Sequence, residues 1–318
     1  MERPRFVIEP SEAESMAKQS GLSVLQLLPS LVKSAQPLAR PSISNFPVGA
    51  VGLCSDGRIF LGVNLEFPGL PLHHSVHAEQ FLVTNIAFHR HSSLRFVAVS
   101  SAPCGHCRQF LQEIRGSPNI RIFITSSQNE GSNPGDDADD DAQFKPLLHF
   151  LPHRFGPDDL LDKDVPLLLE PHNNGLVLVR KKEDSSCNGF AEFCEFEDNL
   201  VAAALEAANE SHAPYSGCPS GAAFVDSVGK VYRGSYMESA AYNPSLGPIQ
   251  AALVAYVASG GGGGYDQIVA GVLVEKEGAA AAQEHTARLL LQLVSPLCEF
   301  RVFHCRSASN DCKKSSSS

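Results

Sequence analysis

The chain of 318 residues has no tryptophan, only three methionines, and no stretch of about 18 uncharged apolar residues. A membrane-spanning helix needs such a stretch, so we predict no membrane span. The first 15 residues also lack the apolar segment of a secretory signal. We therefore expect a cytosolic protein.

Clusters of lysine and arginine are missing as well. The chain has 25 Lys and Arg against 35 Asp and Glu, a formal net charge of -10. Nucleic-acid binding depends on neutralising phosphates, so we expect no nucleic-acid partner. Nine cysteines, an odd number, are spread over the chain. In a cytosolic protein this usage argues against a disulfide framework and favours a metal or catalytic role for some of them.

An internal repeat is the main feature that is present. Residues 44–66 align without a gap to residues 216–238, an offset of 172, with eight of 23 positions identical. The alternating pattern with Asp56-Gly57 predicts a hairpin, because glycine supplies the positive φ of a tight turn. The order β-β-α-β-α-β follows in both halves and predicts a mixed sheet with helices packed against it. The sequence thus predicts one fold written twice.

The remaining segments divide the chain further. A capping-box pattern at Ser11 predicts a short helix through Ser20 that ends at Gly21. The acidic run 129–142 is predicted to be a solvated loop, and Gly260–Gly264 a flexible connector. The predicted domains are an N-terminal helical segment 1–28, a first copy 29–128, a loop and linker 129–184, a second copy 185–306 and a flexible tail 307–318.

Two short motifs in the first copy carry the chemistry. His77-Ala78-Glu79 begins one predicted helix, and the Pro103–Cys107 motif, Pro-Cys-Gly-His-Cys, begins the next after a strand. Alone, Cys-x-x-Cys could be a redox pair, half of a structural zinc site or two buried thiols. Together and in this order, the motifs match the H-x-E and P-C-x-x-C signature of zinc deaminases.

The predicted metal ligands are His77, Cys104 and Cys107, with one zinc per chain. Three protein ligands leave a fourth position for water, which is typical of catalytic sites. The helix N-terminus should lower both thiol pKa values. Zinc lowers the pKa of bound water from ~15.7 toward ~7, and Glu79 is predicted to carry its proton to a ring nitrogen and the leaving amine. A closed site with His106 or an upstream histidine, His73 or His74, is the alternative.

SVHAEQF and SAPCGHCRQF, with FPVGAV, GVNLEF and APYSGCPSGAAF, resemble segments of cytidine deaminases, and the likeness covers nearly the whole chain. The duplication resembles the homodimeric class of enterobacteria and plants. The resemblance implies an α/β fold of two α-β-α sandwich copies after a short helical segment. It also implies hydrolytic deamination of cytidine and deoxycytidine in pyrimidine salvage, by a homodimer.

The resemblance further implies substrate-binding residues. Phe46 would pack on the pyrimidine, Asn64 and Glu66 would bind ribose hydroxyls, the backbone of Ala78 would read the base, and Phe155 would close over the ring. Glu66 recurs as Glu238, so a structural role for this acid competes with sugar binding. Phe46 and Phe155 could instead belong to the core.

The second copy lacks the metal-binding and catalytic motifs of the first. The same offset replaces His77 by Ile249, Glu79 by Ala251 and Asn64 by Tyr236, and no Pro-Cys-x-x-Cys follows. We predict a non-catalytic copy, whose Ala240-Ala241 turn would, by resemblance, contact a partner subunit. Two other functions would use the same zinc motifs. A polynucleotide-editing deaminase would need a basic groove with aromatics, and a non-enzymatic zinc-binding scaffold would need the four motif residues to lack activity.

Overall fold

A computed structural model describes residues 5–89, 93–126, 143–179, 191–260 and 263–308. Contacts divide the chain into two units: Met1–Glu170 with Ser239–Pro244 and Ala258–Gly260, and the remainder. The acidic run 129–142, the centre of the glycine run and the last ten residues lie outside the described ranges. The domain boundaries predicted above remain predictions.

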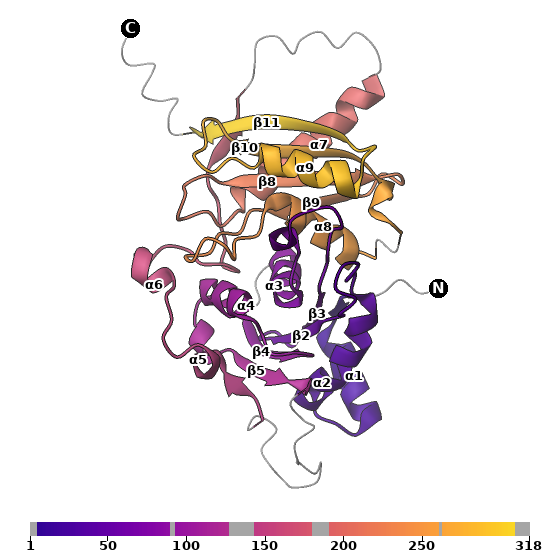
Figure 1. Cartoon of the computed structure of the whole chain (residues 1–318), viewed down its shortest axis with the longest axis vertical. Helices are drawn as coiled ribbons and strands as arrows, with labels where there is room; N and C mark the ends of the chain where they lie inside the picture. Colours follow the sequence, from indigo (N-terminus) through magenta and orange to yellow (C-terminus); the bar gives the residue numbers. More distant parts are fainter. Residues whose placement is uncertain (1–4, 90–92, 127–142, 180–190, 261–262, 309–318) are drawn as a thin grey trace. The chain divides into compact units, whose positions relative to one another are not determined.

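The first unit is built on a six-stranded mixed sheet. Its strand order is β1-β3-β2-β4-β5-β6, in which β4 and β5 pair in parallel and the other neighbours pair antiparallel (Figure 1). Its elements are β1 (Val7–Ile8), α1 (Pro10–Ser20), α2 (Val24–Ala35), β2 (Gly49–Cys54), β3 (Ile59–Val63), α3 (Ala78–Phe88), β4 (Leu94–Val99), α4 (Gly105–Phe110), β5 (Arg121–Ile124), β6 (Lys145–Pro146), α5 (Leu147–Phe150) and α6 (Pro157–Leu160).

The second unit has a five-stranded sheet with the order β7-β11-β10-β8-β9, in which β10 and β11 pair in parallel (Figure 1). The mixed sheet predicted for each copy is confirmed. The elements of this unit are β7 (Leu176–Leu178), α7 (Ala191–Asn209), β8 (Ser220–Asp226), β9 (Val231–Ser235), α8 (Pro248–Ala258), β10 (Ile268–Lys276), α9 (Glu284–Val294) and β11 (Glu299–Ser307).

Helices cover both faces of the first sheet. A Cβ on Gly49 would lie 2.9 Å from the carbonyl oxygen of Val32 in α2, and one on Gly62 would lie 2.3 Å from that of Ala78 in α3. Gly62 pairs with Ala50, the neighbour of Gly49, and successive residues of a strand face opposite sides. The helices α2 and α3 therefore pack on opposite faces, as a sandwich requires.

The second copy repeats this arrangement with its own glycines. A Cβ on Gly221 would lie 2.2 Å from the backbone nitrogen of Ala208 in α7, and one on Gly234 would lie 2.1 Å from that of Ala252 in α8. The recurring glycine pairs thus allow helix backbones to approach the sheet closely. Among the three glycine pairs that recur in the two copies, positive φ explains the turn glycines Gly57 and Gly229, both at 84°.

The N-terminal helix is confirmed through Ser20, and Gly21 ends it with a φ of 68°. The predicted cap at Ser11 is wrong, because the helix already begins at Pro10 and Glu9 is its N-cap. Proline is favoured at the first helical position, where its fixed φ fits and its missing N–H costs nothing.

Each copy also begins with a helix that the sequence analysis missed, α2 in the first and α7 in the second. Ser23 and Gln26 form a capping box at the start of α2, and this pair was the available signal. Pro29 lies inside α2, where proline removes a helical hydrogen bond, and it obscured the pattern. None of the helices in the described ranges combines the length and apolar character needed to span a bilayer.

Candidate metal centre

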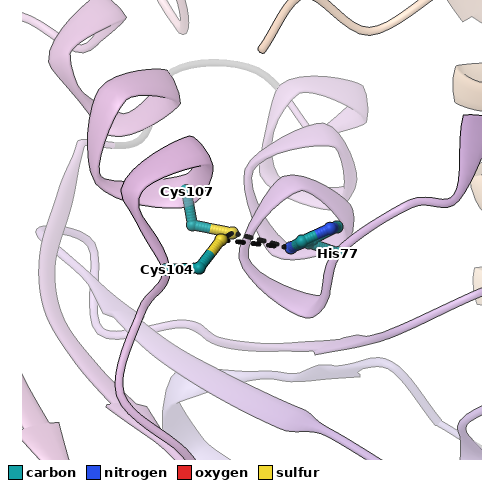
Figure 2. A group of neighbouring side chains, drawn as sticks. All are labelled: His77, Cys104 and Cys107. Atoms are coloured by element: carbon teal, nitrogen blue, oxygen red, sulfur yellow. Dashed lines mark hydrogen bonds between the residues drawn. The ribbon is translucent and has the colours of Figure 1, made fainter. Parts of the chain in front are cut away.

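The three predicted metal ligands lie at the beginnings of two helices. His77 immediately precedes α3 and Cys104 immediately precedes α4, each in an extended backbone conformation. Cys107 lies in the first turn of α4. The two sulfur atoms face the imidazole across the gap between these helices (Figure 2). Residues 27 and 30 positions apart along the chain therefore meet at one point.

The spacing of the donor atoms fits a tetrahedral zinc ion. His77 Nδ1 lies 3.5 Å from Cys104 Sγ and 3.3 Å from Cys107 Sγ, and the two sulfurs are 3.6 Å apart. Zinc–sulfur bonds of about 2.3 Å and zinc–nitrogen bonds of about 2.0 Å place tetrahedral donors about 3.5–3.8 Å apart. Two thiolates and one imidazole are also typical zinc ligands.

The donor group has three members within the described residues. His106, one of the candidates for a fourth ligand, is not part of this group and packs its ring against that of His77, with 4.9 Å between the ring centroids. Three ligands leave one tetrahedral position for water or substrate. The described residues thus favour the open, catalytic type of site over the closed alternative.

The surroundings of the two thiols shift their pKa values in opposite directions. The hydrogen bond with Cys107 lowers the pKa of Cys104 to about 3, and the bond with His77 acts in the same direction. That hydrogen bond with Cys104, together with burial, raises the pKa of Cys107 well above its ordinary value. Cys104 thus has the lowered pKa that favours a thiolate, whereas zinc binding would have to remove the proton of Cys107. That both cysteines bind zinc as thiolates stays a prediction.

Glu79 lies beside the donors without belonging to the donor group. It is the second residue of α3, its side chain is buried, and Oε2 lies 3.2 Å from Cys107 Sγ. Burial raises the pKa of this carboxyl. A raised pKa helps a carboxyl group both to accept and to release a proton near neutral pH.

Glu66 is half-buried and holds a neighbouring loop. Its Oε2 accepts hydrogen bonds of 2.8 Å from the backbone N–H groups of Ile43 and Ser44, and its Oε1 accepts one of 2.6 Å from the Ser44 hydroxyl. Burial alone would raise the pKa of Glu66, but these hydrogen bonds and the charge of His77 lower it. A carboxylate has further lone pairs, so sugar binding stays a prediction.

Asn64 binds the same loop at residues that follow those bound by Glu66. Its Oδ1 accepts a hydrogen bond of 2.8 Å from the N–H of Val48, and its Nδ2 donates one of 3.0 Å to the carbonyl of Phe46. The two side chains proposed for ribose thus both shape the loop that carries Phe46.

The two predicted ring-contacting phenylalanines are not core residues. Phe46 is 58% exposed and Phe155 is 47% exposed, so the core interpretation was wrong. The carbonyl of Phe155 accepts a hydrogen bond from Gln109 of α4, the helix that carries Cys107. Ala78 is the buried first residue of α3. The contacts of these residues with a pyrimidine remain predictions.

Two polar residues beside the site were missed by the sequence analysis. Gln80 and Glu113 are both buried, and both bond to the turn Ser239–Pro244, which belongs to the first unit by its contacts. Ala240 in this turn is buried, and its N–H donates to Glu113 of the same chain. The predicted contact of Ala240 and Ala241 with a partner subunit remains a prediction. The available signal for Gln80 was its place three residues after His77, where glutamine caps a helix.

The structure also corrects which residues of the two copies occupy equivalent positions. Leu65 bridges to Val76 in the first copy, and Met237 bridges to Leu246 in the second, so the offset falls from 172 to 170 before α8. The contacts of Gly62 and Gly234 with their helices give the same offset.

Because the connection before α8 is two residues shorter, Gly247 and Ile249 occupy the places of His77 and Glu79. The sequence-based pairs, Ile249 for His77 and Ala251 for Glu79, were therefore wrong by two positions. The place of Gln80 is taken by Gln250. The second copy still offers neither the ligand nor the acid.

Comparisons with known proteins agree with this site. Residues 24–122 and 147–288 each match a family model described as the cytidine and deoxycytidylate deaminase zinc-binding region. The chain is 63% identical to Cytidine deaminase 1 of Arabidopsis thaliana, over 97% of this chain and 100% of the relative. It is 48% identical to Cytidine deaminase 6 of the same plant, over 95% and 98%.

Among solved structures, the cytidine deaminase from Mycobacterium leprae is 25% identical, covers 40% of this chain and 97% of its own, and gives a TM-score of 0.33. The assignment rests on the family models and the full-length plant relatives, together with the His-Cys-Cys donor group in the first copy. The chain belongs to the cytidine deaminase family, as a zinc-dependent hydrolase in which the deaminase fold occurs twice.

Proposed function

We propose that the first unit hydrolyses cytidine and deoxycytidine to uridine and deoxyuridine with release of ammonia. The observation that supports this most strongly is the buried carboxyl of Glu79 beside an open three-donor zinc site. Zinc in this site would polarise a water molecule and lower its pKa toward ~7.

Glu79 would move the protons of the reaction. Its carboxylate takes a proton from the attacking water and gives it to the ring nitrogen next to the amino-bearing carbon. The water oxygen bonds to that carbon, a second proton passes through Glu79 to the amino group, and the carbon–nitrogen bond breaks to release ammonia. Burial favours this role, because it raises the pKa of Glu79 toward the pH at which protons are exchanged.

The loop held by Asn64 and Glu66 would bind the nucleoside. The exposed ring of Phe46 is available to stack on the pyrimidine, and the polar groups beside it suit ribose hydroxyls. The net charge of -10 favours a free nucleoside over a polynucleotide, whose phosphates need cationic partners. We further propose pyrimidine salvage in the cytosol, by a homodimer as the resemblance implies.

The test is a metal count and an absorbance assay on the full chain. Cytidine, deoxycytidine, CMP and a cytosine-containing oligonucleotide are offered to the wild type and to Glu79→Ala. We expect about one zinc per chain and turnover of the two nucleosides only. Glu79→Ala should keep its zinc and lose activity by at least about 100-fold, the usual lower bound for general acid–base catalysis.

Other outcomes separate the competing functions. Turnover of the oligonucleotide would indicate a polynucleotide deaminase. Bound zinc without turnover of any cytosine compound would indicate a scaffold. A fully active Glu79→Ala would reject the proposed mechanism, and a sedimentation mass of one chain would reject the homodimer.

A further inference from the structure

The turn Ser239–Pro244 is supplied by the second copy in sequence but belongs by its contacts to the unit that holds the metal centre. Within the turn, Tyr242 N–H donates to the carbonyl of Ser239 at 2.8 Å, and Asn243 N–H donates to that of Ala241 at 2.7 Å. Tyr242 has a φ of 61°, a conformation that non-glycine residues rarely adopt. A turn with these internal bonds has a defined shape and can act as a fixed support.

Gln80 connects this turn to a metal ligand. Its side chain is 1% exposed, and both ends of its amide are engaged. Nε2 donates a hydrogen bond of 2.9 Å to the carbonyl of Pro244, and Oε1 accepts one of 3.2 Å from the backbone N–H of His77. One buried amide therefore spans the turn and the residue whose imidazole faces the sulfurs.

Glu113 connects the turn to the other ligand-bearing segment. Its carboxylate is fully buried, and Oε1 accepts a hydrogen bond of 2.7 Å from the N–H of Ala240. Glu113 ends the short 3-10 helix Leu111–Glu113, which directly continues α4 after Cys107. The same turn is thus bonded to the segment of His77 and to the segment of the cysteines.

The Gln80 amide has two roles: its oxygen accepts from the start of α3, and its nitrogen donates to the turn. Comparison with the second copy shows which role belongs to the fold. Gln250 occupies the equivalent position, and a Cβ on Gly247 would lie 2.5 Å from its Oε1. An amide oxygen therefore lies over the start of the helix in both copies, including the copy in which the described residues form no metal-ligand group. This placement of the amide oxygen therefore belongs to the fold, and the inference concerns the amide nitrogen.

We propose that Gln80 and Glu113 are positioning residues that use the turn Ser239–Pro244 to fix His77 relative to Cys104 and Cys107. Groups that orient metal ligands commonly change metal affinity by about 10–100-fold when they are removed. A turn more than 100 residues further along the chain, within the same unit, then contributes to the metal centre without supplying a ligand. This inference rests on the zinc site and not on the choice of nucleoside.

The decisive variant is Gln80→Glu in the full-length protein. Glutamate keeps an oxygen that can accept from His77 N–H but has no N–H to donate to Pro244. We expect zinc to pass to a coloured chelator at least about tenfold faster than from the wild type. We also expect a shifted visible spectrum of the cobalt-substituted protein, because that spectrum reports ligand geometry. The matched control, Gln250→Glu, should resemble the wild type in both measurements.

A second pair of variants tests the other end of the turn. Glu113→Leu removes the acceptor for Ala240 N–H and should also speed zinc loss and shift the cobalt spectrum, whereas Glu113→Gln keeps an acceptor oxygen and should restore both. Circular dichroism identifies any variant that fails to fold, and Gln80→Met then replaces Gln80→Glu. Wild-type zinc retention and cobalt spectrum in folded Gln80→Glu, or in folded Glu113→Leu, would overturn the proposal. Because neither measurement uses substrate, its failure is distinct from that of the proposed reaction.

Discussion

The two copies share one contact, called the clamp below, in which a glutamate side chain binds a serine in the preceding loop. They differ in the residues that could bind a metal ion. In the first copy, Glu66 binds the backbone and hydroxyl of Ser44, and in the second Glu238 binds those of Ser216 in the same way. The residue after each serine has a positive φ, 55° at Asn45 and 61° at Gly217. The clamp persists in the second copy, whose described residues hold no group of metal ligands, so it belongs to the fold.

The start of the following helix shows the opposite behaviour. His77 precedes α3 and Glu79 lies in its first turn, whereas Gly247 precedes α8 and Ile249 lies in its first turn. The duplicated chain thus contains its own reference. A feature present in both copies has a sufficient explanation in folding, and a feature confined to the first copy calls for a chemical one.

The largest expected difference between the copies is the effect of replacing a buried cysteine by serine. Cys107→Ser should abolish zinc binding and activity, because it removes one of three ligands. Cys305 lies in the core of the second unit, where burial raises its thiol pKa to about 11. Cys305→Ser should keep zinc and activity and lower the free energy of unfolding by about 1–3 kcal/mol. A zinc count with thermal denaturation measures both, and zinc loss from Cys305→Ser would break the contrast.

The next difference concerns the glycines beneath the helices. Gly62→Ala and Gly234→Ala both force a Cβ against helix backbone and should each cost about 1–3 kcal/mol or more. Only Gly62→Ala moves α3, so it should also weaken zinc binding, which chelator competition would detect. Equal zinc affinities in the two variants would show that the metal centre tolerates a shift of α3.

The smallest expected difference between the copies is the effect of replacing the glutamate of the clamp by glutamine. Glu66→Gln and Glu238→Gln should destabilise the protein similarly, by about 1–3 kcal/mol, since each leaves backbone donors poorly paired. If Glu66 also binds ribose, only Glu66→Gln should raise KM for cytidine, by about tenfold. Steady-state kinetics with thermal denaturation gives both numbers. An unchanged KM would leave Glu66 with a structural role alone.

The sequence was sufficient for features encoded by local patterns. The metal motifs, the two hairpins and the helices that start at Ala78 and Pro248 follow from spacing and periodicity. The helix α2 was missed because Pro29 is a local signal against a helix, while burial of neighbouring leucines in the core outweighs it.

Features that depend on tertiary contacts could not be predicted in this way. The shortened connection before α8 left no mark in an ungapped alignment that stopped at Glu238. The unequal thiols require the 3.6 Å contact between Cys104 and Cys107. The bond from Gln80 to Pro244 joins residues 164 positions apart, and no spacing rule covers such a distance.

The close packing of Gly62 against α3 has a thermodynamic consequence. Because strand and helix backbones touch there, the segment that begins at His77 cannot separate from the sheet without opening the first unit. Metal binding is then linked to the stability of that unit, since an ion that binds only the folded state stabilises it by mass action. Zinc should raise the melting temperature of the unit that holds the three ligands.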